Sequence, residues 1–219
     1  MKVTTDACLF GAIVANEIKS TRPDTGNILD IGCGTGLLTL MLAQKITATI
    51  DAIEIEKAAA EQATENIIAS PWKNHIHIFH EDAKQFDFKV KYDLIISNPP
   101  FYENELTSGN PKRNIALHNA GLLFDELLRV IKNNLKQEGI FYLLLPYKRI
   151  EEVDKLMKKH KLLLTKKILI RQSVKHDYFR IITSGGHRVS ELKSEELSIR
   201  DEDQQYTPEF MRLLKDYYL

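Results

Sequence analysis

The 219-residue chain is long enough for one full α/β domain and too short for two ordinary ones, so we expect a single domain over residues 1–219. Apolar residues make up 43% and charged residues 27%. No stretch approaches the roughly 18 uninterrupted apolar residues of a membrane span, which argues against a membrane protein. The formal net charge is zero, so the average charge gives no sign of a nucleic-acid partner.

The charge is nevertheless distributed unevenly along the chain. Residues Lys148–Arg188 carry 12 Lys and Arg against 4 acids, and residues Glu191–Leu219 carry 8 acids against 4 Lys and Arg. This basic block is expected to form either a binding face or an ordinary solvated surface, and composition leaves both open.

Short β-branched apolar runs alternate with amphipathic stretches, a pattern typical of a mostly parallel sheet covered by helices on both faces. The strands that we predict lie at Asn27–Asp30, Thr49–Glu54, Ile76–Phe79, Asp93–Ser97, Ile140–Leu145, Leu163–Arg171 and Tyr178–Thr183. The helices that we predict lie at Ala7–Ile18, Leu37–Lys45, Lys57–Ala69, Leu122–Leu135, Arg149–His160 and, as a short closing helix, within Tyr206–Leu219. The segment Phe101–Asn119 has neither period and follows a strand end, so we expect a functional loop there.

The N-terminus and the cysteines indicate where the protein works. Met1–Asp6 shows no charged-then-apolar leader, so we expect a cytoplasmic protein. Cys8 and Cys33 lack metal-ligand spacing, and we expect both to be reduced, with no disulfide and no bound metal.

The strongest local signal is a glycine-rich loop, Asp30–Gly36, between the first predicted strand and a helix. Gly32, Gly34 and Gly36 let the backbone turn sharply and approach a ligand, and the next helix offers unpaired N–H donors. The spacing G-x-G-x-G after an acid differs from the dinucleotide pattern and resembles the loop of S-adenosylmethionine methyltransferases. That resemblance implies that Asp30 balances the positive charge of the cofactor's methionine part, whereas an ordinary tight turn is the alternative.

Two further acids follow the next two strands. Glu54 ends the strand Thr49–Glu54, where a carboxylate can accept both ribose hydroxyls. Ile55 would then flank the adenine ring, and we expect Glu56 to be solvated. Asp82, followed by Ala83, comes after the third strand, where it can accept a hydrogen bond from the adenine amino group of the cofactor.

The motif that points to a reaction is Asn98-Pro99-Pro100-Phe101, directly after the strand Asp93–Ser97. It resembles the tetrapeptide of amino-methyltransferases. An exocyclic amino group is a poor nucleophile, and the Asn98 side-chain oxygen and the Pro99 carbonyl can each accept one of its hydrogens. Pro99 and Pro100 hold this geometry rigidly, and Phe101 offers a ring on which an extruded base can stack.

With these residues, the chain resembles the bacterial methyltransferases that modify adenine 37 at N6 in a valine tRNA. The similarity is nearly full length and includes Met1–Asp6, the glycine loop, Asn98–Phe101, Arg113–His118, Tyr206–Phe210 and Tyr217–Leu219. It implies a class I methyltransferase Rossmann-like fold with a seven-stranded mostly parallel sheet, S-adenosylmethionine as cofactor and tRNA as partner. No membrane or metal is expected, and we expect a monomer.

The resemblance also implies roles for residues that the local patterns do not single out. Thr5 and Asp6 would lie near the methionine end of the cofactor, and Lys112, Arg113 and His118 near the RNA. Solvated loop positions and a helix cap are the alternatives for the last three. Members of the family usually carry a short aromatic and basic segment ahead of the stretch that begins this sequence. The sequence given lacks that segment, and RNA binding is the expected property that this difference from the family affects.

Three other functions remain open from the residues. Asn-Pro-Pro-Phe also occurs in enzymes that methylate guanine N2 in ribosomal RNA. Release-factor glutamine methyltransferases share the tetrapeptide, usually with a final Tyr, so Phe101 disfavours a protein amide. A non-catalytic RNA-binding module is disfavoured by the intact glycine loop and by Asn98.

Overall fold

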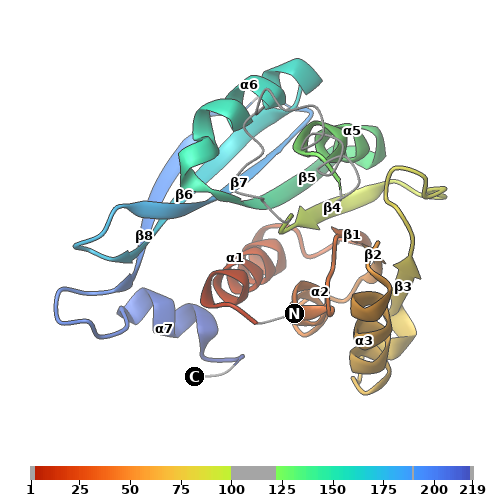
Figure 1. The fold of residues 1–219 in the computed structure, drawn as a ribbon, viewed down its shortest axis with the longest axis horizontal. Coiled ribbons are helices and arrows are strands. Elements are labelled where there is room, and N and C mark those ends of the chain that lie inside the picture. The colour runs from red at the N-terminus through yellow and green to blue at the C-terminus, as the bar shows by residue number, and fades with distance from the viewer. Residues whose placement is uncertain (1–2, 100–121, 189, 218–219) are drawn as a thin grey trace, which may run out of the picture.

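The structure is a computed structural model and describes residues 3–99, 122–188 and 190–217. One sheet runs through these ranges, with strand order β3-β2-β1-β4-β5-β7-β6-β8 (Figure 1). The strands are β1 (Asn27–Ile31), β2 (Thr49–Glu54), β3 (Ile76–His80), β4 (Tyr92–Ser97), β5 (Leu135–Pro146), β6 (Leu163–Ser173), β7 (Tyr178–Gly186) and β8 (Lys193–Arg200). The helices are α1 (Thr5–Thr21), α2 (Leu37–Ala43), α3 (Lys57–Ile68), α5 (Phe124–Asn134), α6 (Ile150–His160) and α7 (Pro208–Leu214), with 3₁₀ turns η1 (Lys73–His75) and η2 (Tyr147–Arg149).

Strands β1 to β5 run parallel, and β7 runs antiparallel to both β5 and β6. The parallel strands therefore end at one edge of the sheet, which we call the carboxyl edge. Strand β1 pairs with β2 on one side and with β4 on the other, so the chain order reverses between β1 and β4. Open α/β sheets bind ligands outside the carboxyl ends of their strands at such a reversal point.

Helices cover both faces of the sheet, as the sequence predicts (Figure 1). Alternate side chains of each strand point to opposite faces, so Ile28 joins the core under α1, α2 and α7, and Leu29 joins the core under α5 and α6. The helix α5 shows the reason for this packing, because its buried residues recur at helical spacing along one face. No helix in the three described ranges is long and apolar enough to span a membrane.

The main departure from the sequence prediction is an eighth strand, β8, which lies at the sheet edge beside β6. Its first four residues are exposed and polar, and only Leu197 and Ile199 are buried. Charged side chains commonly protect sheet edges from pairing with other strands. They also replace the apolar residues whose alternation with polar ones would predict a strand. The predicted α/β class is confirmed, with eight strands where seven were expected.

Candidate functional site

The glycine loop lies between β1 and α2, at the carboxyl edge. Gly32, Gly34 and Gly36 have φ angles of 73°, 57° and 84°, values that L side chains rarely adopt. The N–H groups of Gly32 and Cys33 donate to the Ile53 carbonyl at 2.8 and 3.1 Å. The loop is therefore fixed to the end of β2, and it lies between a strand and a helix, where the sequence pattern predicted it.

Asp30 is fully buried directly below this loop. Its Oδ2 accepts a hydrogen bond from Thr39 Oγ1 at 2.7 Å, and its Oδ1 has no hydrogen-bond partner among the described residues. Burial raises the pKa of Asp30 to about 7, the Thr39 hydrogen bond opposes this rise, and the nearby Glu54 carboxylate adds to it. A buried acid with an unpaired oxygen is costly by itself and suits a positively charged ligand group.

Glu54 lies at the end of β2, and its carboxylate supports the glycine loop. Its Oε2 accepts from the Gly34 N–H at 2.8 Å and its Oε1 from the Glu56 N–H at 2.9 Å. A carboxylate can accept about four hydrogen bonds, so two positions are left, which matches the two hydroxyls of a ribose. The next residue, Ile55, is 53% exposed, as expected for an apolar side chain that flanks a ring. Glu56 is exposed and caps α3 through the N–H groups of Ala58 and Ala59.

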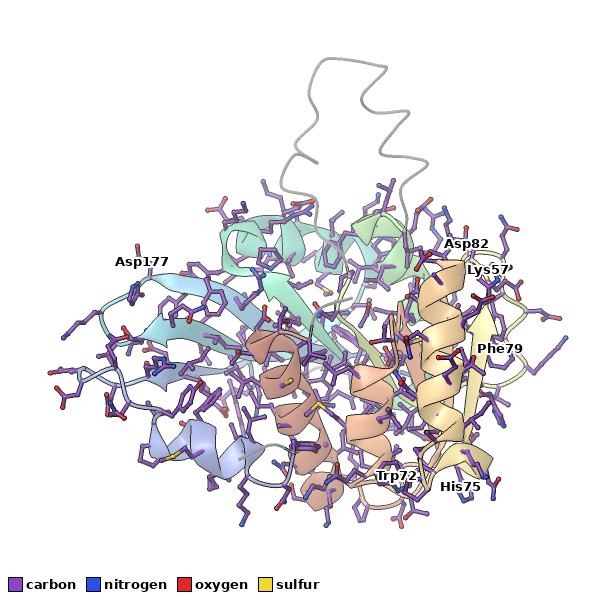
Figure 2. The ribbon with its side chains drawn as sticks, turned by 60° about the horizontal axis from the view of Figure 1, so that its bottom comes forward. Lys57, Trp72, His75, Phe79, Asp82 and Asp177 are labelled. Carbon is purple, nitrogen blue, oxygen red and sulfur yellow. The ribbon has the colours of Figure 1, made fainter. Side chains whose placement is uncertain are left out.

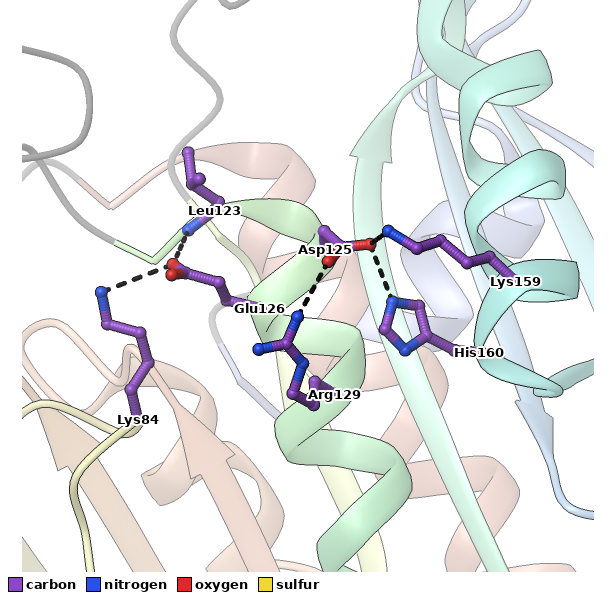
Figure 3. A network of polar contacts seen from close by, with 7 residues as sticks. All are labelled: Lys84, Leu123, Asp125, Glu126, Arg129, Lys159 and His160. Carbon is purple, nitrogen blue, oxygen red and sulfur yellow. Dashed lines mark hydrogen bonds and ion pairs between the residues drawn. The ribbon is translucent and has the colours of Figure 1, made fainter. Parts of the chain in front are cut away.

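Asp82 follows β3 and lies at the same end of the molecule as Lys57, the first residue of α3 (Figure 2). Its Oδ1 accepts from the Lys84 N–H at 2.9 Å. Lys84 Nζ also lies 3.4 Å from Glu126 of α5, whose carboxylate accepts from the Leu123 N–H (Figure 3). The loop after β3 is thereby joined to the start of α5. Ala83 is buried in the core under α5, so its side chain fills the core.

Asn98 is half-buried and Pro99 is buried, directly after β4. The buried Ser97 hydroxyl donates to the Ile31 carbonyl at 2.7 Å. This bond ties the end of β4 to the end of β1, immediately before the glycine loop, and sequence reasoning did not identify it although Ser97 adjoins the motif. Pro100, Phe101, Lys112, Arg113 and His118 lie outside the described residues.

Thr5 and Asp6 begin α1, and Asp6 lies at the carboxyl edge next to β7. Its Oδ2 accepts from Arg180 Nε at 2.8 Å, and its Oδ1 accepts from the Ala7 N–H. Arg180 was not predicted as a site residue, because a pairing between chain positions so far apart leaves no local signal. Thr5 is exposed.

Carboxylates neutralise much of the basic block Lys148–Arg188. The ion pairs of its Lys and Arg side chains include Arg149–Glu152, Lys159–Asp125, Lys166–Glu17, Lys166–Glu195, Lys167–Asp154, Arg171–Glu196, Arg180–Asp6 and Arg188–Glu138. Figure 3 shows one of these pairs, in which Asp125 of α5 contacts Lys159, His160 and Arg129. Seven of the 12 Lys and Arg side chains of the block therefore contact carboxylates, which lowers the net positive charge that it can present to a partner.

The two cysteines and the possible metal ligands were also considered in the sequence prediction. Cys8 and Cys33 are both free and buried, and burial raises the pKa of each thiol. In the described part of the chain, no group of three or more His, Cys, Asp or Glu side chains is placed to hold a metal ion.

The comparison with known proteins identifies relatives along the whole chain. The methyltransferase small domain family matches residues 11–163. A tRNA1(Val) (adenine(37)-N6)-methyltransferase of Cytophaga hutchinsonii is 40% identical over 227 residues, which cover 100% of this chain and 91% of that protein. Other proteins of the same name, including one from Yersinia enterocolitica, are 34–39% identical to this chain.

Solved structures share the fold at lower sequence identity. A predicted O-methyltransferase from Agrobacterium tumefaciens has a TM-score of 0.73 at 16% identity, and the match covers 95% of each chain. A glycopeptide N-methyltransferase in complex with S-adenosylmethionine has a TM-score of 0.59 at 11% identity, over 82% of this chain and 88% of that chain. These similarities confirm the predicted class I methyltransferase fold.

Proposed function

The chain belongs to the family of tRNA1(Val) (adenine(37)-N6)-methyltransferases, and we propose that it methylates N6 of adenine 37 in a valine tRNA. The observation that carries the proposal is the position of Asn98 and Pro99. Both follow β4, and Ser97 joins that strand end to β1 at the glycine loop. A nitrogen held by Asn98 would therefore lie beside a cofactor held by the loop.

The residues around the loop fit S-adenosylmethionine, which supplies an electrophilic methyl group on a positively charged sulfur. The unpaired Asp30 oxygen would face the cationic methionine part. Glu54 has hydrogen-bonding capacity for the ribose, and the exposed Ile55 offers an apolar surface for the adenine. Asp82, the backbone at Ala83, Thr5 and Asp6 complete the proposed cofactor site.

The chemical step depends on hydrogen bonds from the substrate amino group to this chain. The N6 hydrogens donate to the Asn98 side-chain oxygen and to the Pro99 carbonyl, which favours a pyramidal nitrogen with its lone pair directed at the methyl group. The nitrogen would become positive as it takes the methyl group, whose bond to the cofactor sulfur breaks and leaves that sulfur neutral. The two oxygens would stabilise the charge until a proton leaves to solvent. Pro100 and Phe101 belong to the same proposed site, and Lys112, Arg113 and His118 to the proposed RNA contacts.

One experiment tests the proposal directly. The protein is incubated with S-adenosylmethionine and a valine tRNA transcript, and the RNA is then digested to nucleosides. We expect N6-methyladenosine, and none from a transcript with guanine in place of adenine 37. In the same assay Asn98→Ala should lose at least about a hundredfold in rate, while its cofactor affinity stays within several-fold. Methylated guanine, methylated protein or an active Asn98→Ala variant would contradict the assignment.

A further inference from the structure

The part of the carboxyl edge beyond β4 carries aromatic and arginine side chains that the proposed chemistry does not use. Strands β5, β7 and β6 follow β4 in the sheet. Tyr147 comes directly after β5, Tyr178 begins β7, and Arg171 lies near the end of β6. All three side chains are partly exposed. Because β7 runs antiparallel to its neighbours, its first residue reaches the same edge as the last residues of β5 and β6.

These three side chains contact one another in sequence. The rings of Tyr147 and Tyr178 have centroids 5.3 Å apart at an angle of 54°. The Arg171 guanidinium carbon lies 5.6 Å from the centroid of the Tyr178 ring. We call this set the stacking ladder. It presents two aromatic rings and a planar guanidinium, the groups on which unpaired nucleobases stack.

Two polar contacts fix the last member of the ladder. Arg171 Nε donates to Ser198 Oγ at 2.7 Å, and Arg171 Nη2 lies 3.8 Å from Glu196 of β8. Glu196 also accepts a hydrogen bond from the Tyr178 hydroxyl, which raises the pKa of that tyrosine. Because Glu196 balances the charge of Arg171, the ladder is poorly suited to a phosphate. Its flat surfaces are better suited to bases.

The ladder lies within reach of a base held at Asn98. Ser97 of β4 is level with Leu143 of β5, and β5 continues to Pro146, so it extends roughly 10 Å beyond that level. Pro146 pairs with Arg180 of β7. Most of the proposed cofactor residues follow β1, β2 and β3 on the other side of β4. On this side, Asp6 contacts Arg180 of β7, and we assign the edge beyond that contact to the substrate. In Figure 2, Asp177, in the β6–β7 turn, lies across the molecule from Asp82.

We propose that Tyr147, Tyr178 and Arg171 bind the unpaired nucleotides that flank the methylated adenine, by stacking on their bases. This inference rests on the proposed function, since it assumes an RNA substrate. In this proposal, side chains at the ends of β5, β6 and β7 hold the unpaired RNA extended while the target base enters the Asn98 site. These residues therefore position the substrate and take no part in methyl transfer.

The test measures RNA binding and turnover separately. Binding of a fluorescent valine tRNA transcript is followed by anisotropy with S-adenosylhomocysteine present. Tyr178→Ala should weaken it about fivefold to 150-fold, the range for losing one base stack. The KM for tRNA should rise to match, while kcat and cofactor affinity stay within twofold. Tyr178→Phe, which keeps the ring, should bind nearly as the wild type does.

The controls separate stacking from charge and from general damage. The log–log dependence of binding on salt should keep its slope in Tyr178→Ala, because no phosphate contact is lost. Phe88→Ala is the matched control, since Phe88 is a half-buried ring 4.9 Å from Phe86, ahead of β4 and so away from the carboxyl edge. It should bind RNA as the wild type does.

The outcomes distinguish this inference from the proposed function. If the wild-type protein methylates adenine 37 but Tyr178→Ala binds tRNA normally, the ladder is wrong and the proposed function stands. An equal loss of RNA binding in Phe88→Ala, or a parallel loss of cofactor affinity in Tyr178→Ala, would also overturn the ladder. A wild-type protein that binds and methylates no RNA overturns both.

Discussion

Replacing Asp30 by asparagine should remove a pH-dependent loss of stability. Burial raises the pKa of this carboxyl from 3.8 to about 7. The folded state therefore binds more protons than the unfolded state between these two values, and stability falls as the pH rises through that window. The complete penalty is roughly 4 kcal/mol. Between pH 5 and pH 8 the wild type should lose about 2–3 kcal/mol of it.

The asparagine carries no charge, so its contribution to stability should not change with pH. Its oxygen can still accept the Thr39 hydroxyl hydrogen, but its amide nitrogen would occupy the position of the unpaired Oδ1, at a cost of about 1–3 kcal/mol. The stability of Asp30→Asn relative to wild type should therefore rise by about 2–3 kcal/mol between pH 5 and pH 8. Urea unfolding measures this as a change of about 1 M in the difference of midpoints.

The same residue should link cofactor binding to pH. Between pH 5 and pH 7 the amino group of S-adenosylmethionine stays protonated, whereas Asp30 becomes increasingly ionised. Calorimetry should therefore show that the affinity of the wild type for S-adenosylmethionine increases with pH. The affinity of Asp30→Asn should be lower and nearly independent of pH. Adenosine, which lacks the methionine part, is the control ligand. Stability curves that shift in parallel with pH for both proteins would refute the reasoning.

Four further substitutions test contacts in the site and between α5 and α6. Glu54→Ala should weaken cofactor binding, measured by calorimetry, by about 1.5–3 kcal/mol. Glu56→Ala removes only the cap of α3, so it should lower stability by about 1 kcal/mol and leave the cofactor affinity unchanged. An unchanged cofactor affinity in Glu54→Ala would reject the ribose assignment. Ser97→Ala should cost about 1 kcal/mol in urea unfolding and slow methyl transfer at saturating substrates, because Asn98 loses its link to the glycine loop; normal turnover would show that the link is unnecessary. Lys159 and His160 lower the pKa of Asp125 to about 2, so its stabilisation is complete above pH 3.8 and is lost as the pH falls toward 2. Asp125→Asn should therefore lower the Tm more at pH 6 than at pH 3, and an equal effect at both would contradict this.

The sequence predicted the elements that local patterns determine. Strands β1, β2 and β4 and the second half of β5 are largely buried apolar runs, and the glycine loop has a recognisable spacing between a strand and a helix. Both could therefore be identified from neighbouring residues alone. The acids after β2 and β3 were predicted as site residues because parallel strands end at the same edge. The structure places Glu54 against the glycine loop.

The remaining features depend on contacts between distant segments. Strand β8 was missed because its exposed half carries the polar residues of a sheet edge. The charge of the basic block could be counted from the sequence, but its partners could not, since Lys166 pairs with Glu17 of α1. The hydrogen bond from Ser97 to Ile31 and the pairing of Arg180 with Asp6 depend in the same way on how strands and helices pack.

The position of β4 places Asn98 between the two proposed ligand sites. Strand β4 pairs with β1 on one side and with β5 on the other. The glycine loop follows β1, and Tyr147 follows β5, so the end of β4 lies between the proposed cofactor half and the proposed substrate half of the carboxyl edge. A displacement of β4 relative to β1 would separate the acceptor oxygens from the methyl group. The buried Ser97–Ile31 hydrogen bond opposes that displacement at the last residue before the motif. Positional precision for the proposed methyl transfer is therefore supported by the sheet.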